Sequence, residues 1–238
     1  MLIMFKDHKE LSLQVGEQIE NACRGARKSN VRSWVPIGLG DLWGAVLHGE
    51  KLGLIHPGQT VLDMGSGSGS SSLLWAYQGY NVIGIEISQK LARSSKEAVR
   101  KCQNLMKDGL EVRIFNGSYY PKSYIEKREK RKSIAEKIEK EYFGHSRNHK
   151  SEIFFPVCKE DVYKKNKIEM KSIDVFYAYI WGVQGPSIME VFKDYARDDT
   201  ILCIIGRIDE EHIRKIGLFP AVDDAYSYTQ YITKGVFF

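Results

Sequence analysis

A glycine-rich segment next to an acid is the part of the sequence whose chemistry is clearest. Gly65, Gly67 and Gly69 follow Asp63 and the short apolar run Thr60–Leu62. Because glycine has no Cβ, such a segment can turn tightly and bring its backbone close to a ligand. The spacing is G-x-G-x-G, whereas dinucleotide enzymes use G-x-G-x-x-G to seat a pyrophosphate on a helix N-terminus. A carboxylate beside this turn instead suits a ligand that carries a cationic amino-acid group.

A second acid, Glu86, ends the next apolar segment, residues 81–87. An acid at the end of a strand beside a glycine turn can accept hydrogen bonds from both ribose hydroxyls of a nucleoside. Taken alone, Glu86 reads equally well as a surface carboxylate. With the glycine turn upstream, the two features together indicate a nucleoside with a cationic amino-acid end.

These two motifs, within Val61–Ile87, resemble the class I S-adenosylmethionine-dependent methyltransferase family, and the resemblance extends over about residues 58–206. It implies a Rossmann-like fold and S-adenosylmethionine as the cofactor. It also implies that the glycine turn lies against the methionine part of the cofactor, that the acid ending the second strand binds ribose, and that a further acid contacts adenine. The cofactor-binding residues expected from the first two motifs are Asp63, Gly65, Ser66, Gly67, Glu86 and Ile87.

Two positions compete for the acid that contacts adenine in the family. Asp161, with its neighbour Val162, lies thirteen residues before Asp174, a spacing that is usual in the family. The alternative is the Asn116–Ser118 segment after the third strand, where the family often has an acid and this chain has none. We expect Asp161 and Val162 to contact the cofactor.

Aromatic residues mark the expected acceptor side. Tyr177, Tyr179 and Trp181 follow Asp174 in what resembles the fourth strand of the family, and aromatic faces attract a cationic sulfonium. We expect Tyr179 to contact the cofactor and Trp181 the substrate, with core packing as the alternative. Tyr119, beside Tyr120, is a further candidate for substrate binding, again with packing as the alternative. No residue stands out as a catalytic base.

Alternating apolar strand patterns and amphipathic helix patterns predict an α/β fold, a doubly wound, mainly parallel, seven-stranded Rossmann-like sheet. We expect one domain over residues 1–238, with an N-terminal helical extension (1–57) and a helical insertion (118–150). Strands are expected at 60–64, 81–87, 110–116, 153–158, 172–180, 200–206, 218–222 and 226–233. Helices are expected at 8–30, 42–52, 70–78, 88–107, 121–144, 186–197 and 209–216.

Composition narrows the class of protein. The 238 residues are 43% hydrophobic and 27% charged, which is ordinary for a globular protein, and no run has the length of a membrane span. Without an export signal, the cytoplasm is the expected location. The four cysteines lack C-x-x-C spacing, and His145 and His149 lack a carboxylate partner, so no metal site is expected.

The net charge of +5 equals the excess within residues 122–150, which hold ten Lys or Arg and five Glu. That segment is compatible with RNA, although the residues after Asp174 lack the Asn/Asp-Pro-Pro-aromatic motif of nucleic-acid amino-group methylases. We therefore expect methyl transfer to an unidentified small molecule or protein side chain. The alternatives are a non-catalytic binding module, an RNA methyltransferase that uses the basic insertion, and an NAD-linked oxidoreductase. The oligomeric state is not readable from the sequence.

Overall fold

The computed structural model describes residues 13–24, 37–130, 160–180, 184–206, 208, 210–220 and 229–234. In these residues a seven-stranded sheet runs through the molecule in the order β3-β2-β1-β4-β5-β7-β6. β1 to β5 are parallel, while β7 is antiparallel to both β5 and β6. This arrangement confirms the predicted seven-stranded, mainly parallel, Rossmann-like fold.

The strands are short and apolar, as expected where helices cover both faces of a parallel sheet. Four of them, β1, β2, β4 and β5, are almost entirely buried. Their bounds are Thr60–Met64 (β1), Asn81–Glu86 (β2), Val112–Asn116 (β3), Val175–Tyr179 (β4), Ile201–Ile205 (β5), Phe219–Pro220 (β6) and Thr229–Thr233 (β7).

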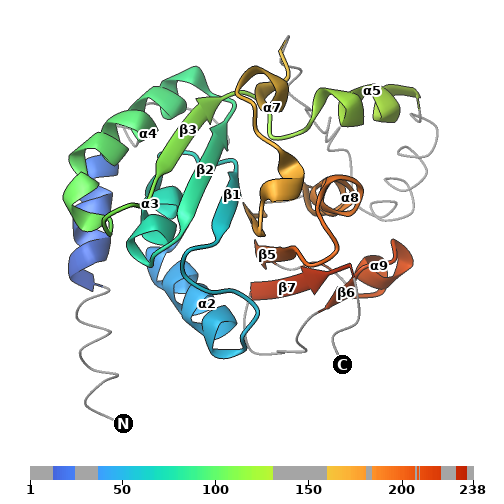
Figure 1. Cartoon of the computed structure of the whole chain (residues 1–238), viewed down its shortest axis with the longest axis horizontal. Helices are drawn as coiled ribbons and strands as arrows, with labels where there is room; N and C mark the ends of the chain where they lie inside the picture. The colour runs from blue at the N-terminus through green and yellow to red at the C-terminus, as the bar shows by residue number, and fades with distance from the viewer. Residues whose placement is uncertain are drawn as a thin grey trace, which may run out of the picture.

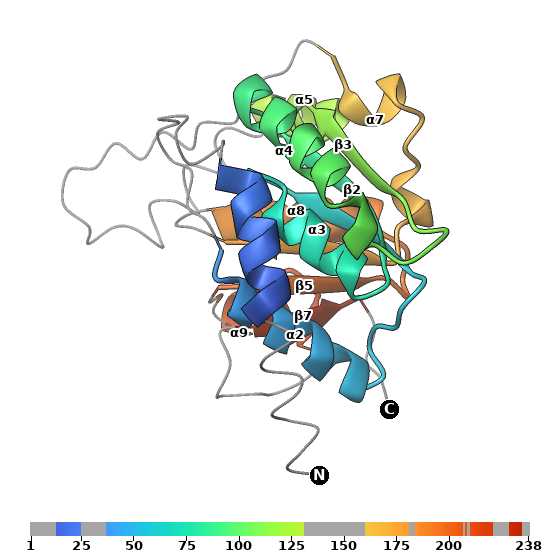
Figure 2. The ribbon, with the colours of Figure 1, turned by 90° about the vertical axis from the view of Figure 1, so that its left-hand side faces the viewer.

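Helices form a layer on each face of the sheet (Figures 1 and 2). One layer consists of the helical residues 13–24 with α2 (Leu39–Lys51), α3 (Ser70–Tyr77) and α4 (Gln89–Lys101). The other consists of α5 (Lys122–Lys130), α7 (Val162–Lys165), α8 (Gly185–Tyr195) and α9 (Glu210–Lys215). Among the helices described, none is both long and apolar enough to cross a membrane.

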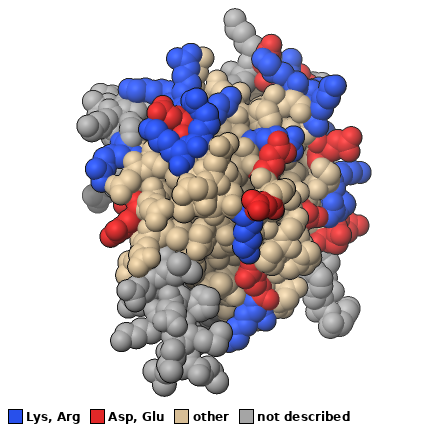
Figure 3. All heavy atoms as spheres, turned by 60° about the vertical axis from the view of Figure 1, so that its left-hand side comes forward, with Lys and Arg blue, Asp and Glu red and all other residues tan. Residues whose placement is uncertain are grey.

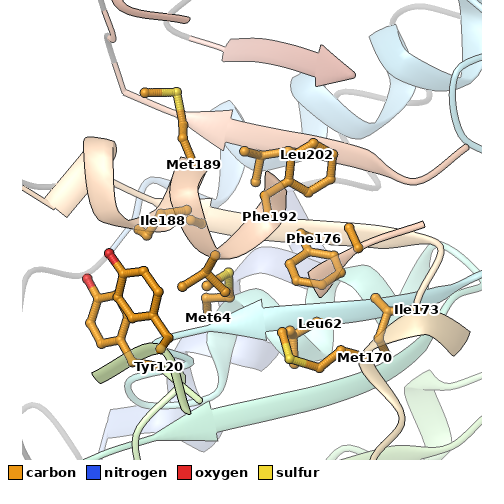
Figure 4. Close-up of a cluster of buried hydrophobic side chains, with 14 of the residues drawn as sticks. Leu62, Met64, Tyr120, Met170, Ile173, Phe176, Ile188, Met189, Phe192 and Leu202 are labelled. Atoms are coloured by element: carbon orange, nitrogen blue, oxygen red, sulfur yellow. The ribbon is translucent and has the colours of Figure 1, made fainter. Parts of the chain in front are cut away.

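Alternation along the strands sends neighbouring side chains into different cores. Val61 and Val175 pack under α2 and α3, while Leu62 and Phe176 pack under α8. Figure 4 shows the second core, with Tyr120 at one end of a cluster that also contains Met64, Ile188, Phe192 and Leu202. The strand ends that follow these buried runs are thus fixed from both sides.

Several elements are shorter than predicted. The strand expected over 172–180 begins at Val175, because Met170–Ser172 forms a 3-10 helix. The helix expected to reach residue 107 ends at Lys101, where Cys102 leaves helical geometry and a 3-10 turn follows. The strand predicted at 153–158 lies outside the described residues, and so does the part of the predicted helix 121–144 that follows Lys130.

Candidate functional site

The glycine turn joins β1 to α3 at the carboxyl end of the sheet. Gly65, Gly67 and Gly69 all have positive φ values, at 90°, 54° and 87°. Side chains with a Cβ rarely adopt this conformation, which is why glycine recurs here. The amides of Gly65 and Ser66 both donate to the Ile85 carbonyl at 2.9 and 3.0 Å, which holds the turn beside the end of β2.

Asp63 lies beneath this turn and is 1% exposed. One of its carboxylate oxygens accepts hydrogen bonds from the hydroxyls of Ser71 and Ser72, at 2.7 and 2.6 Å, in the first turn of α3. Burial raises the pKa of Asp63 to about 6, although the two serine hydrogen bonds act in the opposite direction. Asp63 therefore couples the strand to the helix that follows the turn.

Glu86, at the end of β2, reaches back to the same turn. One carboxylate oxygen accepts a 2.9 Å hydrogen bond from the Gly67 amide and the other a 2.6 Å hydrogen bond from the Ser88 amide. Burial raises its pKa, and these backbone hydrogen bonds lower it. Each oxygen has further lone-pair capacity, which would allow the carboxylate to accept two more donors such as ribose hydroxyls.

The two carboxylates form a buried negative site. Asp63 and Glu86 are each less than 10% exposed, and each is near enough to the other that Glu86 contributes to the raised pKa of Asp63. Within the described part of the chain, neither has a salt bridge to a lysine or arginine. A buried carboxylate without a cationic partner is costly, so a cationic ligand would be favoured here.

The last residue of β3 and the residue that follows it hold the end of β2 and a residue of α7 close together. The Asn116 amide group donates to the carbonyls of Glu86 and Ile87, both at 2.9 Å. Gly117 lies so close to Val162 that a Cβ at this glycine would come within 2.8 Å of the valine Cβ. Val162, one of the predicted cofactor residues, thus packs at the end of β3, while Ile87 is 37% exposed just beyond β2.

Asp161 is engaged in capping. One oxygen accepts from the amides of Tyr163 and Lys164, at 2.9 and 3.1 Å, which caps α7. The other accepts from the Lys122 amide at the start of α5, at 3.1 Å. These contacts explain why an acid stands at this position, and the adenine contact of Asp161 stays a prediction.

Tyr119 lies directly against the turn. The nearest atom to a Cβ built on Gly65 is a carbon of the Tyr119 ring, at 3.7 Å. The Tyr119 hydroxyl donates to that of Tyr120 at 3.4 Å, and the Tyr163 hydroxyl donates to the Tyr119 carbonyl at 2.7 Å. The structure therefore places Tyr119 next to the glycine turn, and its role in substrate binding stays a prediction.

The end of β4 lies beside β1 in the sheet. Tyr177 pairs in register with Asp63 and contacts the ring of Trp75 at 5.6 Å, and it is buried under α3. Tyr179 is partly buried on the same face of the sheet. Trp181 and its predicted substrate contact lie outside the described residues. The same holds for His145 and His149, and the described residues contain no cluster of three metal-ligating side chains.

Sequence reasoning missed the side chains that hold the site together. Ser71, Ser72 and Asn116 bind the acids or the strand ends, and Tyr120 and Tyr163 hold Tyr119. The serine run after the glycine turn was the available signal, since hydroxyls in a first helical turn can reach an acid that ends the preceding strand. No comparable pattern links Tyr163 to Tyr119, which are 44 residues apart.

One known protein family matches the part of the chain that contains this site. Residues 62–120, from β1 to Tyr120, match the sequence model of a family described as "Methyltransferase domain". A search of curated proteins found no match. The family match over residues 62–120 and the sheet topology confirm the prediction of a Rossmann-like methyltransferase fold, and they agree with S-adenosylmethionine as the predicted cofactor.

Solved structures with the same fold are distant in sequence. A mutant of MtNAS in complex with S-adenosylmethionine is 12% identical, with a TM-score of 0.51 over 94% of this chain and 75% of its own. A methyltransferase from Geobacter sulfurreducens is 14% identical, with a TM-score of 0.51 over 94% and 88%. An O-methyltransferase from Bacillus cereus in complex with SAH is 11% identical, with a TM-score of 0.50 over 91% and 89%. At these identities the likeness shows the fold alone.

Proposed function

We propose that this methyltransferase binds S-adenosylmethionine against the β1–α3 turn and transfers its methyl group to a small molecule or a protein side chain. The observation that carries the proposal is the pair of buried carboxylates, Asp63 and Glu86, around a glycine turn without a basic partner among the described residues. The donor has cationic sulfonium and ammonium groups and a ribose, which match this site. A pyrophosphate would be repelled by the same two acids.

The chain's own contribution to the reaction is binding and alignment. When bound, S-adenosylmethionine supplies a methyl group that is already reactive because its sulfur is positively charged. Glu86 would accept hydrogen bonds from the ribose hydroxyls. The turn at Gly65 and Gly67 would let the methionine part of the donor lie close to the backbone. The protein would mainly supply proximity and orientation, and an amine or thiol acceptor does not require a dedicated base.

A Glu86→Gln variant tests the proposal. The substitution removes a charge and places an amide NH₂ group opposite the N–H of Gly67 or Ser88, so affinity for S-adenosylmethionine should fall by about 1–3 kcal/mol. Isothermal titration calorimetry measures this, with Glu169→Gln, an exposed acid, as the control. An unchanged affinity in Glu86→Gln would refute the ribose assignment.

Parallel thermal-shift titrations test the ligand class. S-adenosylmethionine and S-adenosylhomocysteine at about a hundred times their dissociation constants should each stabilise the fold by about 2.7 kcal/mol, and NAD should not. Binding of both adenosyl ligands without turnover on any amine, thiol or protein acceptor would support the non-catalytic binding module instead. A shift with NAD alone would support the oxidoreductase.

The exposed face of α4 favours RNA as a second candidate acceptor. α4 begins three residues after Glu86, and its exposed face carries five Lys or Arg and one Glu. Figure 3, which brings the left side of Figure 1 forward, shows Lys and Arg gathered in its upper part. The basic residues of this face are Lys90, Arg93, Lys96, Arg100 and Lys101.

If α4 binds RNA phosphates, the affinity for RNA should depend on the salt concentration. Affinity for a fluorescent single-stranded RNA should fall steeply with salt, and the double substitution Arg93→Glu and Arg100→Glu should flatten that dependence. The matched control is Arg214→Glu with Lys215→Glu on α9, which lies on the opposite side of the molecule in Figure 1. Equal effects of the two double substitutions, or no binding at low salt, would remove RNA as the acceptor.

A further inference from the structure

One aromatic ring from outside the glycine turn rests on it. Tyr119 follows β3, two strands away from β1 in the sheet, yet a carbon of its ring lies 3.7 Å from the position of a Cβ on Gly65. The Glu86 carboxylate is close enough to raise the pKa of the Tyr119 phenol further, after burial, which is the largest cause. The ring therefore borders the same negative site as the two acids.

Neighbouring groups fix the ring in this place. The Tyr119 and Tyr120 rings are in contact, with centroids 4.4 Å apart, and the Tyr119 hydroxyl donates to the Tyr120 hydroxyl. The Tyr120 hydroxyl lies 3.0 Å from the Ser187 hydroxyl, which donates to the Gln184 carbonyl. Because the Ser187 proton is used in that bond, Tyr120 is the donor to Ser187. The tyrosine pair is thus tied to the start of α8.

The backbone at Tyr119 is held as well. The Tyr163 hydroxyl, from α7, donates to the Tyr119 carbonyl at 2.7 Å. Tyr120 also stacks on Tyr124 of α5, with centroids 5.6 Å apart and an angle of 15° between the rings. Side chains from α5, α7 and α8 therefore converge on one pair of tyrosines.

We infer that the Tyr119 ring is the surface on which the cationic sulfonium of the methyl donor is recognised. An aromatic face attracts a cation, and the attraction grows where water is excluded and where acids such as Asp63 and Glu86 already favour positive charge. This role rests on the proposed function, because it assigns one more residue to the same cofactor site. It differs from the role in substrate binding that the sequence indicated for Tyr119.

The comparison of two ligands isolates the effect. S-adenosylhomocysteine lacks the transferable methyl group and the sulfonium charge and is otherwise the same molecule as S-adenosylmethionine. In Tyr119→Leu, the preference for S-adenosylmethionine over S-adenosylhomocysteine, measured as the ratio of their dissociation constants, should fall by about 3- to 30-fold. In Tyr119→Phe, which keeps the aromatic face, the ratio should stay within about twofold of the wild type.

Tyr195→Leu, which removes a tyrosine that contacts Ser123 and Lys127 on α5, serves as the control and should leave the ratio unchanged. If Tyr119→Leu does not fold, pentafluorophenylalanine at position 119 replaces it, with Tyr119→Phe as its reference. Fluorination removes the negative face of the ring without changing its shape, so the ratio should again fall. An unchanged ratio in Tyr119→Leu, or in the fluorinated protein where that replaces it, overturns the inference alone. Failure of the wild type to bind either ligand overturns the proposed function and this role with it.

Discussion

Asp63 and Glu86 hold the local fold together and are also the two residues proposed to favour a cationic ligand. Each carboxylate is buried, and each is partly compensated by local donors: two serine hydroxyls for Asp63 and two backbone amides for Glu86. The raised pKa values show that these donors do not offset the full cost of burial. A bound cation would supply the remaining stabilisation, so ligand binding and stability should be linked through the same two groups.

The burial of Asp63 should make the stability of the fold depend on pH. Its pKa is about 6 in the folded state and near 3.8 in the unfolded state, so between these values the folded protein binds more protons. Stability contributed by this group is therefore highest at low pH and falls as pH rises, by about 1 kcal/mol between pH 5 and pH 7. Asp63→Asn should remove this loss from urea unfolding curves recorded at the two pH values.

The control for this prediction is Asp108→Asn, because Asp108 is exposed and its substitution should leave the pH profile as in the wild type. Glu86 also has a raised pKa and contributes with the same sign, so some pH dependence should persist in Asp63→Asn. A profile for Asp63→Asn that matches the wild type would mean that Asp63 is ionised at both pH values.

At the scale of elements, the glycine turn also determines how closely two helices approach. Gly69 is the N-cap of α3 and has a left-handed conformation, and a Cβ at this position would meet the Ser95 hydroxyl of α4 at 2.2 Å and the Ser95 Cα at 3.3 Å. Gly69→Ala therefore combines backbone strain with a clash against α4. The free energy of unfolding should fall by about 2–4 kcal/mol in chemical denaturation.

Gly58 provides a matched control for this substitution. Its φ of 91° is close to the 87° of Gly69, but a Cβ at Gly58 would meet nothing within 4 Å. Gly58→Ala should therefore cost only the strain, about 1–2 kcal/mol. Equal costs at the two positions would show that α4 moves aside without a cost in free energy. If Gly69→Ala costs more than Gly58→Ala, adding Ser95→Gly to Gly69→Ala should recover part of the difference.

The sequence predicted elements better than contacts, for a physical reason. β1, β2 and β5 are mainly apolar runs, and their burial between two helical layers makes that pattern visible without knowledge of their neighbours. The strand predicted around β4 began too early and the helix predicted around α4 ended too late, because a short 3-10 helix lies just before β4 and just after α4.

The candidate site also contains residues that could be predicted from the sequence and residues that could not. The glycine turn, Asp63 and Glu86 could be predicted, because they lie within 27 residues and their spacing is set by one strand–turn–helix–strand unit. The location of Tyr119 could not, because it depends on Tyr163 of α7 and on Ser187 of α8, which the fold alone brings near. Asp161 was predicted to contact the cofactor. The structure shows its carboxylate at the starts of α5 and α7, and the contact with the cofactor stays a prediction.

At the scale of the whole molecule, the N-terminal helices and the C-terminal strand meet. The Tyr231 hydroxyl of β7 donates to the Ala45 carbonyl of α2. Gly49, one turn further along α2, lies against the same tyrosine. β7 also closes the sheet beside β5, whose Cys203 pairs with Tyr231 in register. Segments from near the two ends of the described chain thus share one buried contact, which should make their unfolding cooperative.

A substitution at Gly49 tests this contact. A Cβ there would lie 2.7 Å from the Tyr231 hydroxyl oxygen and 2.9 Å from Ile55 Cδ1, so Gly49→Ala should destabilise the whole fold by about 1–3 kcal/mol. Gly44→Ala on the same helix is the control: nothing lies within 4 Å, and the gain in helix propensity should stabilise the protein by about 0.5–1 kcal/mol. Unfolding monitored by circular dichroism and by tryptophan fluorescence should shift together in Gly49→Ala, because the contact joins both helical and sheet elements. Separate shifts of the two signals would show that the N-terminal helices unfold independently of the sheet, and a Gly49→Ala protein as stable as Gly44→Ala would show that Tyr231 yields without cost.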